Sequence, residues 1–439
     1  MNSQQYTSFR DQLLAAFREG EERMNGASKS AFHQVRRSAL QTFELLGFPT
    51  IRHEEWKYSN VKAMVNETYA FDDGTALTAD DLGALQIPNL AGNILYFVNG
   101  HYRPDLSQIV SPGTHLQIRS FADALQTDAE TIGLHFSRYA DFQDSAFTAL
   151  NTAFAHDGVF IRVPDNKTVE APIILRFITD ARAQNVAVQP RNLIVIGRNA
   201  EVKIAESYRT LGEHAAFTNV VTEVVVAADA RVEHYRIQND SGRANHIART
   251  QVSQADSSHY YNATITLNGG FVRNDLNIVL NGQHCEAFMY GLYMPNGTQH
   301  VDNHTLVDHA YPNSYSNELY KGILDDRGTG VFNGKIYVRP DAQKTNAYQS
   351  CKNVVLSPEA SMNTKPQLEI YADDVKCSHG TTTGKPNEEA LFYLQSRGIP
   401  KEAARTLLLY AFAEDVVSNI KIQPIREYLE GIIREKLAM

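Results

Sequence analysis

The residues best suited to chemistry lie in one short stretch near the C-terminus, DDVKCSHGTTTGK, over residues 373–385. It contains Cys377 and His379, whose thiolate and imidazole are ligands for soft transition-metal sites. Side chains alternate between the two faces of a β-strand, so these two residues should share one face. Structural zinc needs four ligands, and this stretch offers two. The pattern indicates either half of a metal site, completed by a second subunit, or a buried cysteine beside a hydrogen-bonded histidine.

The same stretch comes close to a nucleotide-binding phosphate loop. That loop has the pattern G-x-x-x-x-G-K-[ST], in which backbone amides surround the phosphates and the hydroxyl reaches magnesium. Here Gly380, Gly384 and Lys385 are spaced one residue too closely, and Pro386 replaces the hydroxyl. We therefore expect no nucleotide here, and we interpret GTTTGK as a loop that ends the β-region.

The elements that must position these residues are mostly β-strands. From Gly158 onward, β-branched runs are separated by Gly, Asn and Asp for more than 200 residues, with no helical segment between them. Polar turns that lead into strands recur about every 28 residues, around Ala200, Ala230, Ser257 and Cys285. Repeated units that cannot bury their own faces are typical of a β-solenoid, which we favour over a β-sandwich.

Other candidate ligands fall inside this repeat. Cys351 precedes Cys377 by about one repeat and could stack on it from the adjacent coil, although an unrelated core thiol is the stronger interpretation. His300, His304 and His309 lie in a segment of strand and turn, where their spacing should not converge, so we expect structural roles. The glycine-rich DDRGTGVFNGK indicates tight turns.

Helices are expected at both ends of the chain. Phe9, Leu13 and Phe17 recur at helical spacing near the N-terminus. After the β-region, Asn387 can cap a helix and Pro400 can begin another. We predict a mostly helical domain over 1–157, a β-solenoid over 158–384 and a helical cap or docking module over 385–439.

Composition excludes several classes of function. The net charge of −9 argues against a general nucleic-acid surface, and 43% hydrophobic with 21% charged residues is typical of a folded protein. No apolar run is long enough for a membrane span, and the N-terminus lacks a signal-peptide pattern. Three scattered cysteines do not form a disulfide framework. We expect a cytoplasmic protein with free thiols.

Four segments in succession carry a specific resemblance: GVFNGKIYV, AQKTNAYQS, LEIYADDVKCSHGTTTG and LFYLQSRGIPKEAA. Together they resemble the SufB/SufD family of the SUF iron–sulfur assembly system, closest to its SufD branch. The resemblance covers roughly residues 150–439, with EEWKYS as a weaker N-terminal match. It implies a right-handed parallel β-helix between helical N- and C-terminal domains, in agreement with the three zones above.

The resemblance also implies a role. It implies a non-catalytic scaffold subunit that pairs with SufB and binds the SufC ATPase through its C-terminal helices, so that ATP enters only through SufC. A nascent iron–sulfur cluster would form at the SufB interface, with Cys377 and His379 from this chain. Whether a reduced flavin binds the assembled complex is left open. We assign the ATPase contact to a set of C-terminal residues, Phe392, Tyr393, Leu394, Arg397 and Gly398.

Two further expectations follow from the predicted solenoid. Its free strand edges invite pairing with another chain, so without SufB the isolated chain should form a homodimer. The alternative function is a solenoid enzyme acting on polysaccharide, with Asp325–Asp326 or Asp373–Asp374 as acid and base. Adjacent residues on a strand point to opposite faces, which argues against either pair facing one groove.

Overall fold

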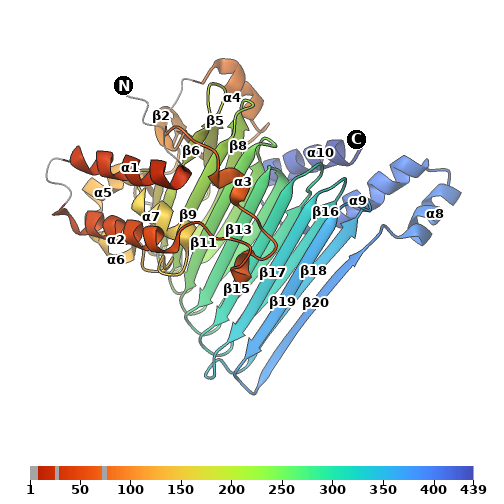
Figure 1. The fold of residues 1–439 in the computed structure, drawn as a ribbon. Coiled ribbons are helices and arrows are strands. Elements are labelled where there is room, and N and C mark those ends of the chain that lie inside the picture. Colours follow the sequence, from red (N-terminus) through yellow and green to blue (C-terminus); the bar gives the residue numbers. More distant parts are fainter. Residues whose placement is uncertain (1–7, 25–28, 72–76, 439) are drawn as a thin grey trace.

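The chain winds parallel strands into a flattened solenoid with helices at both ends (Figure 1). The structure is a computed structural model, and it describes residues 8–24, 29–71 and 77–438. From residue 201 onward, successive strands alternate between two sheets, so each coil places one strand in either sheet. The predicted fold class, a mainly β parallel solenoid flanked by helices, is confirmed.

Sheet I contains ten strands within the described residues. In spatial order they are β2 (His101–Gln108), β1 (Asn93–Val98), β5 (Ile173–Asp180), β8 (Glu201–Leu211), β10 (Arg231–Asn239), β12 (His259–Asn268), β14 (Glu286–Tyr293), β16 (Tyr315–Leu324), β18 (Thr345–Val355) and β20 (Val375–Gly384). All neighbours are parallel except β1 and β2, which form an antiparallel pair.

Sheet II lies opposite and is also built from ten strands of the described chain. Its order is β19 (Ser361–Ile370), β17 (Thr329–Val338), β15 (His300–His309), β13 (Phe271–Leu280), β11 (Ala244–Gln254), β9 (Ala216–Val226), β7 (Arg191–Ile196), β4 (Val159–Val163) and β3 (Gln117–Ser120), with β6 (Val186–Val188) beside β9. Only β3 and β4 pair in antiparallel fashion within it.

A recurring corner explains the repeat seen in the sequence. Each strand of sheet I from β8 to β16 begins two residues after a residue with positive φ, a conformation that polar residues such as Asn and Asp tolerate best. These residues are Asn199, Asp229, Ser257, His284 and Asn313. A small, fully buried side chain follows each one, namely Ala200, Ala230, Ser258, Cys285 and Ser314. Cys285 is therefore one of a stack of small corner residues, and its role is structural.

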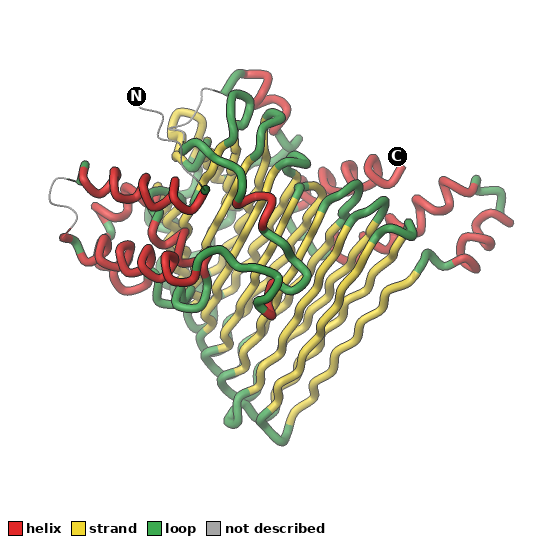
Figure 2. The backbone as a smooth tube through the Cα atoms, in the orientation of Figure 1, coloured by secondary structure: helices red, strands yellow, loops and turns green. Residues whose placement is uncertain are grey.

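Helices cover the outer faces of both sheets near the start and along the flank (Figure 2). On sheet II, α1 (Phe9–Glu22), α2 (Ala31–Leu46) and α7 (Ala146–Ala153) pack apolar side chains against Phe217, Ile247 and Phe271. On sheet I, α9 (Lys401–Val417) and α10 (Gln423–Ala438) cover apolar side chains from β5 to β16. The remaining helices are η2 (Glu54–Trp56), α3 (Lys62–Val65), α4 (Ala79–Leu85), α5 (Phe121–Thr127), α6 (Ala129–His135) and α8 (Glu388–Ser396).

The helical ends are continuous with the solenoid. Strands β1, β2 and β3 lie inside the segment expected to be mostly helical, and they extend both sheets. At the other end, α9 and α10 share one apolar cluster with sheet I. Across the described residues, no helix combines the length and apolar composition that crossing a bilayer would require.

Candidate functional site at the open end of the solenoid

The last coil of the solenoid, made of β19 and β20, has a free edge in both sheets. Within the described chain, β20 pairs only with β18, and β19 pairs only with β17. Figure 1 shows both strands at the rim away from α1 and α2. Their outer rows of backbone N–H and C=O groups therefore lack strand partners, which is the condition for adding a strand from another chain.

Cys377 and His379 lie on the inner face of this last coil. Cys377 is in register with Ala347 and His379 with Gln349. Both partners on β18 are buried, at 0% and 3% exposure, and so their row faces the interior. Cys377 is half-buried beside apolar residues that include Ala347, whereas His379 is exposed at the open end. The two side chains thus share one face, as their spacing indicates.

These two donors do not complete a metal site in one chain. Among the residues that the structure describes, no group of three or more His, Cys, Asp or Glu side chains could hold a metal ion. Burial raises the pKa of the Cys377 thiol, and a hydrogen bond with the Ala347 backbone opposes this only in part. In the single chain, without a partner at the open end, this thiol is therefore protonated at neutral pH. A bound metal would have to displace the proton.

Cys351 is not stacked on Cys377, in agreement with the preferred interpretation of an unrelated core thiol. Cys351 is in register with Thr381, two positions along the same inner face from His379. It is fully buried, and burial raises the pKa of its thiol to about 12. The Asn353 amide donates a hydrogen bond to its sulfur over 3.4 Å. Cys351 is therefore an inert thiol of the packed interior.

The glycine- and threonine-rich end of the candidate stretch is a strand, so its interpretation as a loop is wrong. β20 continues through Gly384 and pairs with β18 to that residue. The next helix, α8, begins only at Glu388, where the Asn387 side chain accepts a hydrogen bond from the Ala390 amide. A phosphate loop would need a turn that opens directly into a helix, so this geometry agrees with the predicted absence of a nucleotide here.

The three histidines of β15 do not converge, in agreement with their predicted structural roles. His300 and His304 point outward, and His309 points inward. His300 Nε2 lies 2.8 Å from Ser59 Oγ, and His309 Nε2 lies 2.9 Å from Ser316 Oγ.

Neither aspartate pair faces a groove with the other. Asp325 and Asp326 lie in the turn from β16 to β17, and Asp373 and Asp374 lie in the turn from β19 to β20. The first turn leads from sheet I to sheet II and the second leads back, so the two pairs lie at opposite ends of the strands. Asp326 accepts a hydrogen bond from the Gly297 amide and so supports its own corner. This placement keeps an acid and a base from being drawn from different pairs. Within each pair the two residues are neighbours in one turn, whereas glycosidic cleavage needs two carboxyl groups about 5–10 Å apart across a groove.

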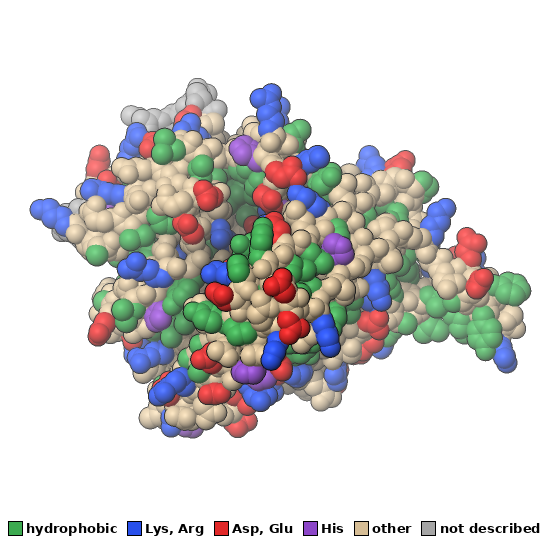
Figure 3. Space-filling view, turned by 90° about the horizontal axis from the view of Figure 1, so that it is seen from below, with side chains coloured by type: hydrophobic (Ala, Val, Ile, Leu, Met, Phe, Trp, Pro, Cys, Tyr) green, Lys and Arg blue, Asp and Glu red, His purple; other side chains and the backbone are tan. Residues whose placement is uncertain are grey.

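The predicted ATPase-contact residues lie on and just after α8, which projects from the solenoid. Phe392 and Tyr393 are 72% and 57% exposed, and Figure 3 shows apolar side chains gathered on this projection. The Arg397 guanidinium lies 5.4 Å from the Tyr393 ring centroid. Gly398 has φ +87° and ends the helix in a conformation that favours glycine. Leu394 is partly buried.

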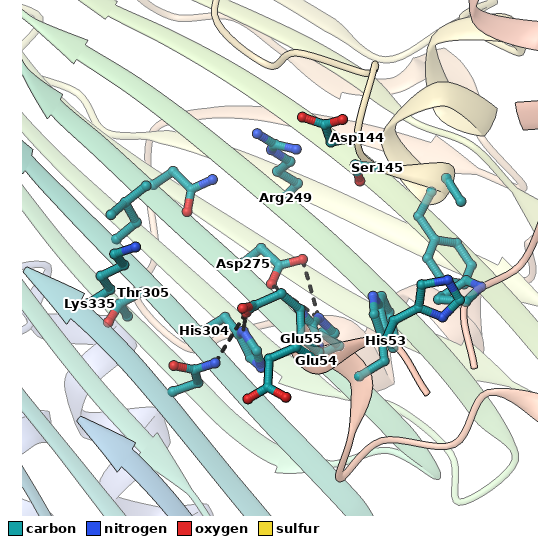
Figure 4. Close-up of a pocket in the computed structure, with 18 of the residues that line it drawn as sticks. His53, Glu54, Glu55, Asp144, Ser145, Arg249, Asp275, His304, Thr305 and Lys335 are labelled. Carbon is teal, nitrogen blue, oxygen red and sulfur yellow. Dashed lines mark hydrogen bonds and ion pairs between the residues drawn. The ribbon is translucent and has the colours of Figure 1, made fainter. Parts of the chain in front are cut away.

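A cavity of about 680 Å³, which no sequence pattern indicated, lies between η2 and the outer face of sheet II (Figure 4). Glu55 from η2 lies 3.3 Å from His304 Nδ1, and His304 Nε2 lies 3.0 Å from Asp302 Oδ1. Arg273 pairs with Asp302 at 3.0 Å, and its guanidinium lies 4.0 Å from the Trp56 ring centroid. These contacts attach the EEWKYS segment to sheet II.

The electrostatics of this contact between η2 and sheet II favour the charged forms of Glu55, Asp302 and His304. Burial and Arg273 lower the pKa of His304, but Asp302 and Glu55 outweigh both and raise it overall. Burial raises the pKa of Asp302, but its cationic neighbours hold it well below its usual range. Glu55 of η2 and Asp302 of β15 therefore both pair with the His304 imidazole.

The fold and its open end define a β-solenoid protein whose last coil carries a cysteine and a histidine on one strand face. Comparison with known families then places the chain. Residues 177–412 match the SufBD core domain of SUF system iron–sulfur cluster assembly, and residues 7–175 match the SufBD protein N-terminal region. The chain therefore belongs to the SufBD family, and its role lies in iron–sulfur cluster assembly by the SUF system.

Individual relatives agree with this assignment. An iron–sulfur cluster assembly SufBD family protein of Synechocystis sp. is 31% identical over 433 residues, which cover 97% of this chain and 94% of the relative. The iron–sulfur cluster assembly protein SufD of Escherichia coli is 29% identical over 400 residues, with 91% of both chains covered. SufD of Bacillus subtilis is 28% identical over 292 residues, or 66% of each chain.

Proposed function

We propose that this chain is a non-catalytic, SufD-like scaffold subunit of a SufBCD-type complex. In this proposal a nascent iron–sulfur cluster forms where the open end of the solenoid meets a SufB-type partner. One observation carries the proposal: Cys377 and His379 share the inner face of the last coil, and no third ligand accompanies them in the described chain. Two soft donors at a free edge are what one half of a shared site requires.

The free edge gives this partner a way to bind. A strand added beside β20 would satisfy its unpaired backbone groups and bring the partner's side chains next to Cys377 and His379. The same edge would let the isolated chain pair with a second copy about a two-fold axis.

ATP enters the proposal only through a SufC-type ATPase on α8. A reduced flavin is proposed for the assembled complex as a whole, and no residue of this chain is assigned to it.

Replacing His379 with alanine should reduce cluster formation by the assembled complex by about tenfold or more, the effect typical of altered metal surroundings. His379 is exposed, so the free energy of unfolding should change by less than about 0.5 kcal/mol, and the melting temperature should stay within a few degrees. Cluster formation is followed by visible absorption under anaerobic conditions. His214→Ala, at another exposed histidine in the turn before β9, is the matched control and should behave like the natural chain.

Cys377→Ser should lower cluster formation similarly and destabilise the chain more, because this side chain is half-buried in an apolar cluster. Light scattering of each variant checks that it still assembles with its partner subunits as the natural chain does. Full cluster formation with both Cys377 and His379 replaced would contradict the proposed role and leave this stretch as a strand end.

The ATPase contact has a separate test. Phe392→Ala combined with Tyr393→Ala should weaken ATPase binding by about tenfold or more, because exposed aromatic residues commonly dominate binding energy. These point changes are preferable to removing residues 387–439, since that deletion would uncover the apolar outer face of sheet I. Affinity is measured by calorimetry, with Leu134→Ala, at an exposed position on α6, as the control. Unchanged affinity in the double variant would remove α8 from the contact.

A further inference from the structure

Three polar side chains form one row along the inner face of sheet I, over the last three coils. Glu318 on β16 is in register with Gln349 on β18, and Gln349 is in register with His379 on β20. Neighbouring strands are about 4.8 Å apart, so side chains in such a row can hydrogen-bond from one strand to the next. The row leads from the closed interior to the open end.

The inner two members are already joined. Glu318 and Gln349 are 2% and 3% exposed, and Gln349 Nε2 donates a hydrogen bond to Glu318 Oε2 over 2.9 Å. In this contact the amide NH₂ group of Gln349 faces Glu318 on β16. Gln349 Oε1 must then face elsewhere. It is buried and has no hydrogen-bond partner among the described residues.

The opposite sheet leaves room for this amide. A Cβ atom at Gly334 on β17 would lie 2.3 Å from Gln349 Nε2, so any larger residue there would displace it. On the next coil Pro366 takes the register position of Gly334, and its side chain offers no hydrogen-bond donor. Gly334 and Pro366 therefore supply no side-chain donor to Gln349 Oε1, whereas the imidazole of His379, at the adjacent position of the row, carries an N–H group.

An unpaired buried amide oxygen is costly. Leaving such an acceptor without a donor costs about 1–3 kcal/mol, and buried polar groups of folded proteins are nearly always satisfied. An apolar side chain at position 349 would avoid this cost. The arrangement is thus better explained by a donor that reaches Gln349 Oε1 when the open end is covered.

We propose that Gln349, held by Glu318, is the positioning residue for His379: its Oε1 accepts the N–H of the imidazole and so directs the other ring nitrogen toward the metal. The inference rests on the proposed role of His379 as a ligand. A ligating histidine commonly donates its second N–H to a fixed acceptor, which sets the tautomer and the ring orientation. Here the acceptor would be an amide, oriented in turn by a buried carboxyl group.

The test uses the complex of this chain with its SufB-type partner, titrated anaerobically with Co²⁺ and followed by visible absorption. Gln349→Met keeps the volume of the side chain and removes the acceptor, and it should weaken Co²⁺ binding by about 10- to 100-fold. In the His379→Ala background, Gln349→Met should weaken binding no further. A merely structural role would instead give equal losses in both backgrounds, and that result would overturn the inference.

Two further measurements separate the possible failures. Gly334→Ala keeps Gln349 but displaces its amide, so it should reproduce the loss of Gln349→Met if the orientation matters. The pH at which protons displace Co²⁺ should also shift in Gln349→Met, since the variant loses the acceptor that sets the basicity of the imidazole. If His379→Ala itself leaves Co²⁺ affinity unchanged, the proposed role of His379 fails. If only Gln349→Met leaves it unchanged, the positioning role alone fails.

Discussion

Replacing Glu223 with alanine should lower the free energy of unfolding by about 3–5 kcal/mol, because it leaves a buried arginine without its counter-charge. Glu223 on β9 and Arg191 on β7 form an ion pair in which both side chains are fully buried. The other carboxylate contacts are backbone amides: Ser137 donates over 2.8 Å, Tyr139 over 2.9 Å and Ala140 over 3.0 Å. One carboxylate therefore anchors the segment before α7 to sheet II.

Urea denaturation of the natural chain and the variant measures this loss. The matched control is the double variant Glu223→Met, Arg191→Met, which removes both charges and should be more stable than Glu223→Ala alone. A loss below about 1 kcal/mol in Glu223→Ala would show that water or a rearranged neighbour compensates Arg191, and it would contradict the expected anchoring.

Glu318→Gln should remove a pH-dependent contribution of about 3 kcal/mol to the free energy of unfolding. Burial raises the pKa of Glu318 to about 7 in the folded chain, against 4.5 for an ordinary glutamate. The folded state thus holds this proton more tightly than the unfolded state. The contribution to stability is full below about pH 4.5 and is lost as the pH rises through 7, and the gap of 2.5 in pKa corresponds to about 3 kcal/mol.

The measurement is the difference in free energy of unfolding between the natural chain and Glu318→Gln, from pH 5 to pH 9. The variant should gain relative stability as the pH rises, because glutamine carries no charge into the interior. Glu359→Gln, at an exposed turn position, should show no such trend. A flat difference for Glu318→Gln would mean that the carboxyl group ionises in a wetter site than the structure shows.

The solenoid could be predicted because its cause is local. The residue with positive φ and the small residue after it must recur at each corner, as at Asn199–Ala200 and Asp229–Ala230, so the period is visible in the sequence. The sequence patterns did not distinguish strands β1 to β3 from the helices around them. These strands are short or exposed, and the solenoid partners of β1 and β3 are distant in sequence: Asn93 pairs with Ile173, and Ser120 pairs with Val159.

The site was predicted only in part, for two physical reasons. GTTTGK has no apolar alternation because the inner face of the last coil is not buried within one chain, so the pattern that identifies a strand is missing. The cavity beside η2 depends on contacts such as Glu54 with Lys365, which are 311 residues apart in sequence. Gln349 and Glu318 likewise meet only through strand register, which the sequence does not state.

The order of the coils along the chain also sets the order in which the ribosome delivers them. The helix-covered coils are synthesised first, and each can stack on the one before it as it emerges. Every partial solenoid exposes the edge of its newest coil, and the next coil covers that edge when it stacks. Within the described chain no later coil covers β20, so its edge stays open after synthesis until another chain pairs with it.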